Sequence, residues 1–478
     1  MVRVSALHTR REFLKTAAAC AGAAAGLRLF GAPQVRAEPA PAAKLRVAVI
    51  GCGIQGSHAH LSAALNEKLV AIVDADENNL AKALRQVQKL QPAGYAAGIR
   101  TFTDYRVLFD KLGRELDAVT IATPNHHHAL PALMAMKLGK GVYLEKPLAY
   151  NLGEVRALVE CARTCKVPTQ MGNQGHSGEG YRRLCEYIWA GAIGQVNTVY
   201  AWTNRSNGGV GPRPPAEPAP RGLHWPEWIG PAPDRDYHPE LHPHAWHGWF
   251  DFGNGSLGNL GCHVLDGACW ALQLEHPTVI EAEELIGGSD ERYPVGTRLR
   301  WDFPARDSRP AVQVYWYDGL KKVARRKTAA ADSGEVTVDG QNRPPLVGEL
   351  EQKYNVKLGG NGALYLGDQG IMHTATYGGG VRILPEAQHQ ATPVPEKKLP
   401  RIKGSHFHDF FQACRGGPPP CASFDYGARL TGLLLLGDLA IRAGVGRKVV
   451  WDGPAMRCTN LPELNRYLQR ENRKGWEA

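Results

Sequence analysis

The sequence predicts an α/β protein whose first domain is a doubly wound parallel sheet and whose second domain is an α+β unit with an open, mostly antiparallel sheet. From residue 44 to about residue 166, short apolar runs alternate with helical patterns, which is typical of parallel strands joined by helical crossovers. Beyond residue 190, strand-like runs follow one another with few helices between them, which favours antiparallel pairing. We therefore expect domains at 44–166 and 167–400, and C-terminal helices at 401–478 that pack back on the first domain.

The first elements of the parallel sheet surround a glycine-rich turn. Residues 45–50 form an apolar, β-rich run, residues 57–69 have a helical pattern, and residues 70–73 form a second strand that ends at Asp74. The turn between the first strand and the helix reads Gly51-Cys52-Gly53-Ile54-Gln55-Gly56, which is GxGxxG. Strand, motif, helix, strand and acid in this order predict a dinucleotide-binding Rossmann unit.

The glycines and the acid have separate expected roles. Gly51 makes the tight turn, Gly53 lets the backbone approach a diphosphate, and Gly56 lets the helix pack closely on the strand. The carboxylate of Asp74 can accept both ribose hydroxyls and would repel a 2′-phosphate, so NAD is expected and NADP is less favoured. A helix N-cap or turn role is the alternative for Asp74. The expected cofactor contacts of this unit are Gly51, Gly53, Ile54, Gln55, Gly56 and Asp74.

Two further strands of the first domain end in polar segments. The strand at 118–122 runs into Thr123-Pro124-Asn125-His126-His127-His128, and the strand at 141–144 runs into Glu145-Lys146-Pro147. Ligands of doubly wound sheets bind outside the carboxyl ends of the strands, so both segments should meet at the nicotinamide. Lys146 should then reach the reacting carbon, and a solvated lysine in a turn is the alternative. The expected cofactor contacts here are Thr123, Pro124, Asn125, His128, Glu145 and Lys146.

The remaining elements follow from apolar periodicity and from turn residues. Helices are expected at 127–138, 152–165, 181–190, 406–415 and 426–443. Strands are expected at 168–171, 196–202, 278–284, 297–303 and 312–317. Loops are expected at 212–233, 339–345 and 388–400.

The segment before the first strand resembles a twin-arginine export signal. Arg10 and Arg11 precede a mildly apolar, Ala/Gly-rich stretch at 16–30, and Val35-Arg36-Ala37 offers small residues for cleavage. An ordinary basic helix is the alternative, and it does not explain the Ala/Gly run. We therefore expect residues 1–37 to be a signal peptide, the twin-arginine translocase to be a partner during export, and the mature protein to be periplasmic or otherwise exported. This route passes folded proteins, so a tightly bound nucleotide is expected.

Charge and composition narrow the possible functions. The formal net charge is +10, and residues 1–37 contribute half of it through six basic residues and one acidic residue. No cluster of Lys and Arg interleaves with aromatic residues, so nucleic-acid binding is not expected. No apolar run approaches the ~20 residues of a membrane span. The ten cysteines show no CxxC pair and no metal-ligand spacing, so no metal site is expected.

The glycine-rich motif, the Thr-Pro-Asn turn and the Glu-Lys-Pro segment occur together in this order. In this combination the chain resembles the Gfo/Idh/MocA family of glucose–fructose oxidoreductase and inositol dehydrogenase. The resemblance implies an NAD(P)-dependent oxidoreductase in which Lys146 binds and polarises a substrate hydroxyl and Glu145 lines the nicotinamide site. It further implies a cis bond before Pro147 and a homo-oligomer, a dimer or tetramer, that pairs through the open sheet.

The resemblance also implies a helix that carries an Asp and a His one turn apart. Residues 255–266 match its Gly-rich start and its histidine at His263, but Asn259 stands where the Asp is expected. Positions four residues apart share a helix face. The imidazole of His263 can accept the proton of a carbinol, whereas the amide of Asn259 can hold a hydroxyl but cannot take a proton. A core histidine is the alternative for His263, and a structural or a functional role is equally open for Asp266.

Substrate-binding candidates lie between these two clusters. Gln174 and His176 follow a predicted strand end and offer amide and imidazole groups to a polyhydroxylated ligand. Residues 225–249 are crowded with Trp, Tyr and His, and aromatic faces such as that of Trp246 pack on the C–H surfaces of sugars. The alternatives for this region are an aromatic core or subunit interface, and a metal site whose histidine spacing fits no common pattern. The expected substrate contacts are Gln174, His176, Trp246, Asn259 and His263.

Three functions are compatible with these features, and the sequence favours the first. The first is an exported NAD-dependent oxidoreductase that acts on a sugar, cyclitol or related polyol or keto-sugar. The second is a redox-neutral glycosidase, in which transient oxidation acidifies the adjacent C–H, the aglycone is eliminated, water adds and the hydride returns. The third is a non-catalytic ligand-binding protein, which is favoured if Asn259 has removed activity.

Overall fold

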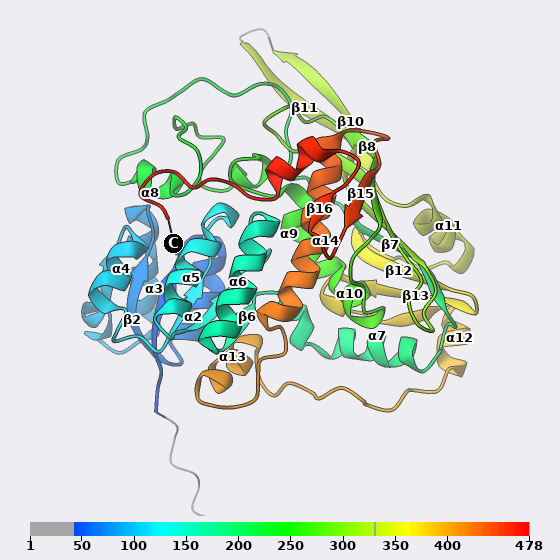
Figure 1. Ribbon diagram of the computed structural model, residues 1–478, viewed down its shortest axis with the longest axis horizontal. Coiled ribbons are helices and arrows are strands. Elements are labelled where there is room, and N and C mark those ends of the chain that lie inside the picture. The colour runs from blue at the N-terminus through cyan, green and yellow to red at the C-terminus, as the bar shows by residue number, and fades with distance from the viewer. Residues whose placement is uncertain (1–42, 329–330, 478) are drawn as a thin grey trace, which may run out of the picture. The chain divides into compact units, whose positions relative to one another are not determined.

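The computed structural model describes residues 43–328 and 331–477 (Figure 1). The predicted twin-arginine signal, residues 1–37, lies outside the described residues, so export stays a prediction. The predicted fold class is confirmed, because the described residues form a parallel sheet flanked by helices and a second, mostly antiparallel sheet. In Figure 1 the first domain is blue to cyan, and the second sheet is mostly green to yellow, with β15 and β16 in red.

The first sheet has the strand order β3-β2-β1-β4-β5-β6, and all its neighbouring strands are parallel. Its strands are β1 Arg46–Ile50, β2 Lys68–Val73, β3 Arg100–Phe102, β4 Ala118–Ile121, β5 Gly141–Leu144 and β6 Thr169–Met171. The order changes direction between β1 and β4, which creates the crevice where doubly wound sheets bind ligands. Because β6 pairs with β5, the sheet extends past the boundary at residue 166 expected from the sequence.

Helices cross between these strands, and a polar side chain caps several of them. They are a π-helical turn Gly56–His60 with α2 Leu61–Ala64, then α3 Glu77–Leu90, α4 Tyr105–Leu112, α5 Ala129–Lys137 and α6 Leu152–Cys165. The side chains of Asp76, Asp104 and Asn151 each accept a backbone N–H in the first turn of α3, α4 and α6. These caps satisfy donors that the helix itself leaves free.

The first crossover helix is shorter than the sequence pattern indicates. The prediction of a helix over residues 57–69 is wrong at its C-terminal end, because the helix ends at Ala64. Lys68 and Leu69 belong to β2, where they pair with Arg46 and Val47 of β1. Pairing with a strand from elsewhere in the chain overrides the local helical pattern.

The second sheet has the order β14-β13-β12-β7-β10-β9-β8-β15-β16, with β11 paired to β10. Among the described strands, β7 and β10 are parallel and the other neighbouring pairs are antiparallel. The strands are β7 Val196–Thr203, β8 Val279–Ile286, β9 Gly296–Phe303, β10 Val312–Thr328, β11 Ala331–Gln341, β12 Asn361–Gly367, β13 Gly370–Ala375, β14 Arg382–Leu384, β15 Val449–Asp452 and β16 Arg457–Cys458. The prediction of an open, mostly antiparallel sheet is therefore confirmed.

Several predicted loops and strand ends differ from the structure. The strand predicted to end at residue 317 continues to Thr328, and β11 occupies the first part of the loop predicted at 339–345. The first part of the loop predicted at 388–400 belongs to helix α12, Glu386–Ala391. In these places tertiary pairing and packing stabilise elements whose own sequences carry turn-forming residues.

The helices of the second half are α7 Glu179–Trp189, α8 Trp225–Ile229, α9 Gly255–Val264, α10 Asp266–Ala271, α11 Pro345–Tyr354, α12, α13 His406–Cys414 and α14 Phe424–Ala443. Helix α14, orange in Figure 1, contacts α6 of the first domain and β8 and α9 of the second. Thr431 accepts the N–H of Leu148 at 3.0 Å, and Leu433 accepts the indole N–H of Trp301 at 3.0 Å. This helix therefore joins the cores of both sheets. Among the described residues, no helix is both long and apolar enough to cross a membrane.

Candidate active site

A cavity of about 480 Å³ lies outside the carboxyl ends of β1, β4 and β5 and is lined by both domains. Its walls include most residues that the sequence singles out for the cofactor: Gly51, Gly53, Ile54, Gln55, Asp74, Thr123, Pro124, Asn125, His128, Glu145 and Lys146. They also include four of the expected substrate contacts: Gln174, Trp246, Asn259 and His263. Segments far apart in the sequence therefore meet at the crevice of the doubly wound sheet.

The glycine-rich turn has the geometry that a diphosphate needs. Gly51 has φ +90°, and a Cβ there would lie 2.6 Å from the carbonyl of Ala122. A Cβ on Gly56 would lie 1.9 Å from the carbonyl oxygen of Gly51, so the helix touches the turn that follows β1 at this point. A Cβ on Gly53 would meet nothing within 4 Å and would project into open space. The turn therefore offers bare backbone beside that space, which fits a dinucleotide diphosphate.

Asp74 closes the other side of this turn at the end of β2. Its Oδ2 accepts the N–H of Cys52 at 2.7 Å, and its Oδ1 accepts the N–H of Asp76 at 2.8 Å. Burial raises the pKa of Asp74 to about 6. Its Oδ1 also accepts from Asn79 Nδ2 at 3.3 Å. A carboxylate has about four acceptor positions, so Asp74 can hold the turn and still accept one ribose hydroxyl. The structural and the cofactor-binding interpretation of this residue are therefore compatible.

Glu145 is a buried carboxylate at the end of β5. It accepts hydrogen bonds from His60 Nε2 at 3.1 Å, Gln174 Nε2 at 3.1 Å and Gln55 Nε2 at 3.2 Å. Burial alone would raise the pKa of Glu145, but the hydrogen bond and charge of His60 together with Lys146 lower it to about 2. Glu145 therefore stays ionised and connects the glycine-rich turn to the substrate-side residue Gln174.

Lys146 follows directly and reaches helix α9 of the second domain. Its Nζ donates to the backbone oxygen of Asn259 at 2.7 Å and to the Oδ1 of Asn259 at 3.0 Å. The amide of Asn259 in turn donates to Asn207 Oδ1 at 3.1 Å. Burial lowers the pKa of Lys146. The peptide bond between Lys146 and Pro147 is cis, as the family resemblance implies.

His263 lies one helical turn after Asn259 and also lines the cavity. Burial, with the nearby charge of Lys146, lowers the pKa of His263 to about 3, so its imidazole is neutral near pH 7. Its ring packs on Tyr377 with ring centroids 4.6 Å apart, and its Nδ1 has no hydrogen-bond partner among the described residues. The backbone oxygen of His263 accepts the hydroxyl of Tyr181. A neutral, positioned imidazole is a proton acceptor.

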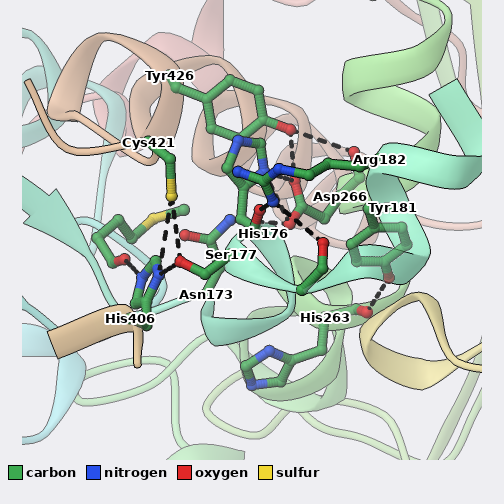
Figure 2. Close-up of polar contacts among 12 residues, drawn as sticks. Asn173, His176, Ser177, Tyr181, Arg182, His263, Asp266, His406, Cys421 and Tyr426 are labelled. Carbon is green, nitrogen blue, oxygen red and sulfur yellow. Dashed lines mark hydrogen bonds and ion pairs between the residues drawn. The ribbon is translucent and has the colours of Figure 1, made fainter. Parts of the chain in front are cut away.

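A buried polar cluster lies behind His263 (Figure 2). The carboxylate of Asp266 accepts hydrogen bonds from Asn173 Nδ2 at 3.0 Å, His176 Nδ1 at 3.0 Å and the hydroxyl of Tyr426. His176 stacks on Trp270 with ring centroids 3.9 Å apart, and its side chain is 2% exposed. Figure 2 shows the ring of His263 directed away from this cluster.

The prediction that His176 binds substrate is therefore wrong. A buried carboxylate needs donors, and His176 supplies one to Asp266 instead of facing the cavity. The sequence left a structural and a functional role open for Asp266, and its contacts fit the structural role. The Asp266 cluster joins α10, directly after the helix of His263, to the 3-10 turn Gln174–Ser177 that carries Gln174. The cluster thus holds two cavity walls together.

A long segment between β7 and α9 runs along the first domain beside the cavity. Residues 212–250, which we call the covering segment, meet the end of β2 through a bridge of Leu223 with Asp76. The N–H of His224 donates to Ala75 at 2.9 Å, and the N–H of Glu77 donates to Gly222 at 2.9 Å. Trp228 and His242 of this segment line the cavity together with Trp476 near the end of the chain. The side of the cavity next to Asp74 is therefore walled by residues distant in sequence.

Two family models match this chain. A model described as oxidoreductase family, NAD-binding Rossmann fold, matches residues 45–173, and one described as the C-terminal alpha/beta domain of this family matches residues 192–290. The chain belongs to the Gfo/Idh/MocA oxidoreductase family. The resemblance expected from the sequence is thereby confirmed, and the domain at 45–173 matches the NAD-binding Rossmann fold of that family.

The relatives in this family differ in their names. Inositol 2-dehydrogenase of Salmonella typhimurium is 28% identical over 161 residues, which are 33% of this chain and 45% of that protein. A glycosyl hydrolase family 109 protein of Parabacteroides distasonis is 30% identical over 213 residues, 38% of this chain and 44% of that protein. The matches therefore span less than half the length of these relatives.

A solved structure supports the fold over a longer range. The WlbA dehydrogenase of Bordetella pertussis, solved with NADH and UDP-GlcNAcA, is 15% identical with a TM-score of 0.55. The alignment covers 86% of this chain and 99% of that chain. At this identity the likeness concerns the fold alone.

The site also contains residues that the sequence did not single out. His60 binds Glu145, Asn207 binds Asn259, and Arg205 and Tyr377 line the cavity. Tyr377 has φ 62° and is followed by Gly378 with φ 77°. The run Tyr377-Gly378-Gly379-Gly380 was the available signal for an unusual turn at a functional position. The other three residues lie in segments with no motif, so only their long-range contacts reveal them.

Proposed function

We propose that this protein oxidises a secondary hydroxyl of a sugar, cyclitol or related polyol, or reduces the corresponding keto form. One observation carries the proposal: Lys146, Asn259 and His263 meet at one end of the cavity whose other end is the glycine-rich turn. NAD, when bound, supplies the acceptor or donor of the hydride. The side chains of the protein then have to bind the hydroxyl and move its proton.

The roles of these side chains follow from their chemistry. The ammonium of Lys146 stabilises negative charge on the hydroxyl oxygen as the proton leaves. His263 accepts that proton, because its imidazole is neutral, although a pKa of about 3 makes it a weak base. Asn259 orients Lys146 through two oxygens and cannot take a proton. Gln174 and Trp246 line the same cavity and offer an amide and an aromatic face to the substrate.

We further propose that the cofactor is NAD and that it stays bound during purification. Asp74 supports NAD, because its carboxylate would repel a 2′-phosphate. The covering segment and Trp476 support slow release, because they wall the side of the cavity next to Asp74, where we propose that the adenosine lies. We also propose that the protein is exported to the periplasm through the twin-arginine route and that it assembles into a homo-oligomer.

A redox-neutral glycosidase is the second candidate. The match to a glycosyl hydrolase family 109 protein over 213 residues favours it. In that reaction the hydride returns to the sugar, so the same Lys146 and His263 would serve an oxidation and a later reduction. A tightly bound nucleotide suits both candidates equally.

One experiment separates the candidates. Purified protein is denatured to identify any released nucleotide, and native protein is given sugars and chromogenic glycosides while NADH absorbance and aglycone release are followed. NADH formation without aglycone release supports the oxidoreductase. Aglycone release at constant NADH absorbance, without added NAD, overturns it in favour of the glycosidase. Bound nucleotide with neither signal for any compound indicates a ligand-binding protein.

A further inference from the structure

The charges that line the cavity are unevenly distributed. The carboxylates on its walls are Asp74, Asp104, Glu145 and Glu227. Asp104 is paired with Arg106 at 2.6 Å, and Glu145 accepts three hydrogen bonds from neighbouring side chains. Asp74 holds the glycine-rich turn, and Glu227 lies on α8 of the covering segment. The carboxylates thus belong to the cofactor side or already have partners.

The opposite end of the cavity, which we call the substrate end, is lined by Gln174, Arg205, His244, Trp246, His247, Asn259, His263 and Tyr377. None of these residues is acidic. Burial lowers the pKa values of His247 and His263, so both imidazoles are neutral near pH 7. The charged groups near this end are therefore Arg205 and the adjoining residues Glu145 and Lys146, whose opposite charges partly offset each other.

The guanidinium of Arg205 has no hydrogen-bond or ion-pair partner among the described residues. Its backbone N–H donates to Thr203 Oγ1 at 3.2 Å, which fixes the start of the segment after β7. Two residues later, Asn207 accepts the amide of Asn259, the residue that also binds Lys146. The charge of Arg205 also acts on Tyr377, where it opposes the rise in pKa that burial causes. Arg205 is thus close to the groups that surround the reacting hydroxyl.

Asn259 increases this positive excess. The family pattern places a carboxylate at position 259, next to Lys146 and one turn before His263. Here Lys146 meets a backbone oxygen and an amide oxygen, which carry no net charge. A negative group supplied by the substrate would pair with Arg205 and would also favour the protonated form of His263. It would therefore supply the charge that position 259 lacks.

We infer that the substrate is a sugar or polyol that carries an anionic substituent, a carboxylate or a phosphate, and that Arg205 selects it. This inference rests on the proposed function for the reacting hydroxyl. The planar guanidinium can bind either oxyanion through two parallel hydrogen bonds. A neutral sugar would leave Arg205 at the substrate end without an anionic partner.

Equilibrium binding to the nucleotide-loaded protein tests the inference without requiring turnover. The probes are glucuronate, galacturonate and gluconate, their neutral counterparts glucose and galactose, and glucose 6-phosphate, each followed by intrinsic fluorescence. For wild type we expect the best anionic probe to bind about 10- to 100-fold tighter than its neutral counterpart, the usual effect of a charge-assisted hydrogen bond. In Arg205→Gln this preference should fall to about 2-fold or less. Arg457→Gln, an exposed arginine on β16 outside the cavity, is the matched control and should bind as wild type.

Each outcome has a defined meaning. Preference for a sugar acid or for glucose 6-phosphate identifies the anionic group, provided that it depends on Arg205. Equal binding of acidic and neutral probes, no binding of any probe, or an unchanged preference in Arg205→Gln overturns the inference. Oxidation of neutral sugars alone would retain the proposed function and reject this inference. Arg205-dependent binding of a sugar acid that is never oxidised would support this inference and reject the proposed function.

Discussion

Replacing Asn259 by Asp restores the carboxylate that the family pattern places beside Lys146. The Nζ of Lys146 lies 3.0 Å from Oδ1 of Asn259, so a carboxylate oxygen there would form a direct ion pair. At an effective dielectric constant of about 20 the attraction at this distance is about 5 kcal/mol, and removing the new charge from water costs several kcal/mol. A net gain of about 1–3 kcal/mol would raise the pKa of Lys146 by about 1–2 units.

The same substitution acts on His263, one helical turn away. Its pKa of about 3 should rise, because a nearby carboxylate favours the imidazolium, and a stronger base should accept the carbinol proton faster. The assay is single-turnover reduction of bound NAD as a function of pH. In the pH–rate profile we expect a higher plateau rate. The acidic limb should move to higher pH because His263 becomes protonated at higher pH. The alkaline limb should also move to higher pH because Lys146 keeps its proton to a higher pH.

The matched control is Asn197→Asp, the same change at an exposed position of β7 away from the cavity. It should leave both limbs unchanged. The reasoning is refuted if the alkaline limb of Asn259→Asp coincides with that of wild type, because the ion pair with Lys146 would then have no effect on the reaction. A lower plateau rate would show that Asn259 is an adaptation of this protein.

Three further perturbations test other parts of the site. Lys146→Ala should keep the nucleotide bound and lower turnover by about 10²–10⁴-fold, and turnover equal to wild type would exclude Lys146 from the mechanism. Gly53→Val places a side chain in the open space of the turn, so released nucleotide should fall while the far-UV circular dichroism stays unchanged; full nucleotide content would contradict the diphosphate assignment. Asp74 should become protonated below about pH 6 and then accept fewer hydrogen bonds from ribose, so nucleotide retention in wild type should fall as the pH is lowered through that range. In Asp74→Asn nucleotide retention should be low at every pH.

The local patterns of the sequence were sufficient for the fold class of the first domain and for placing the glycine-rich turn and Lys146 at the carboxyl edge of its sheet. A glycine-rich turn between a strand and a helix needs bare backbone at particular positions, and the open space at Gly53 and the contact at Gly56 follow from this local requirement. Lys146 was assigned in the same way, because a segment that follows a parallel strand must emerge at the carboxyl edge of the sheet.

The partners of buried polar groups could not be read from the sequence. His176 and His263 are both buried, yet His176 binds the buried carboxylate of Asp266 and His263 faces the cavity. Which of them needs a partner depends on where Asp266 comes to lie, and 90 residues separate Asp266 from His176. The sequence alone predicted a substrate role for both histidines, and the structure places only His263 on the cavity wall.

The sequence by itself determined the fold class, the dinucleotide turn and the segment that carries Lys146, because these depend on contacts between neighbouring residues and on strand direction. Only the tertiary structure decided that Arg205 and Tyr377 line the substrate end, and that the covering segment walls the side of the cavity next to Asp74. These residues come from turns between distant strands, and their positions are set by the packing of two sheets. The composition of the substrate end, and hence its positive charge, therefore emerges only when both domains are folded.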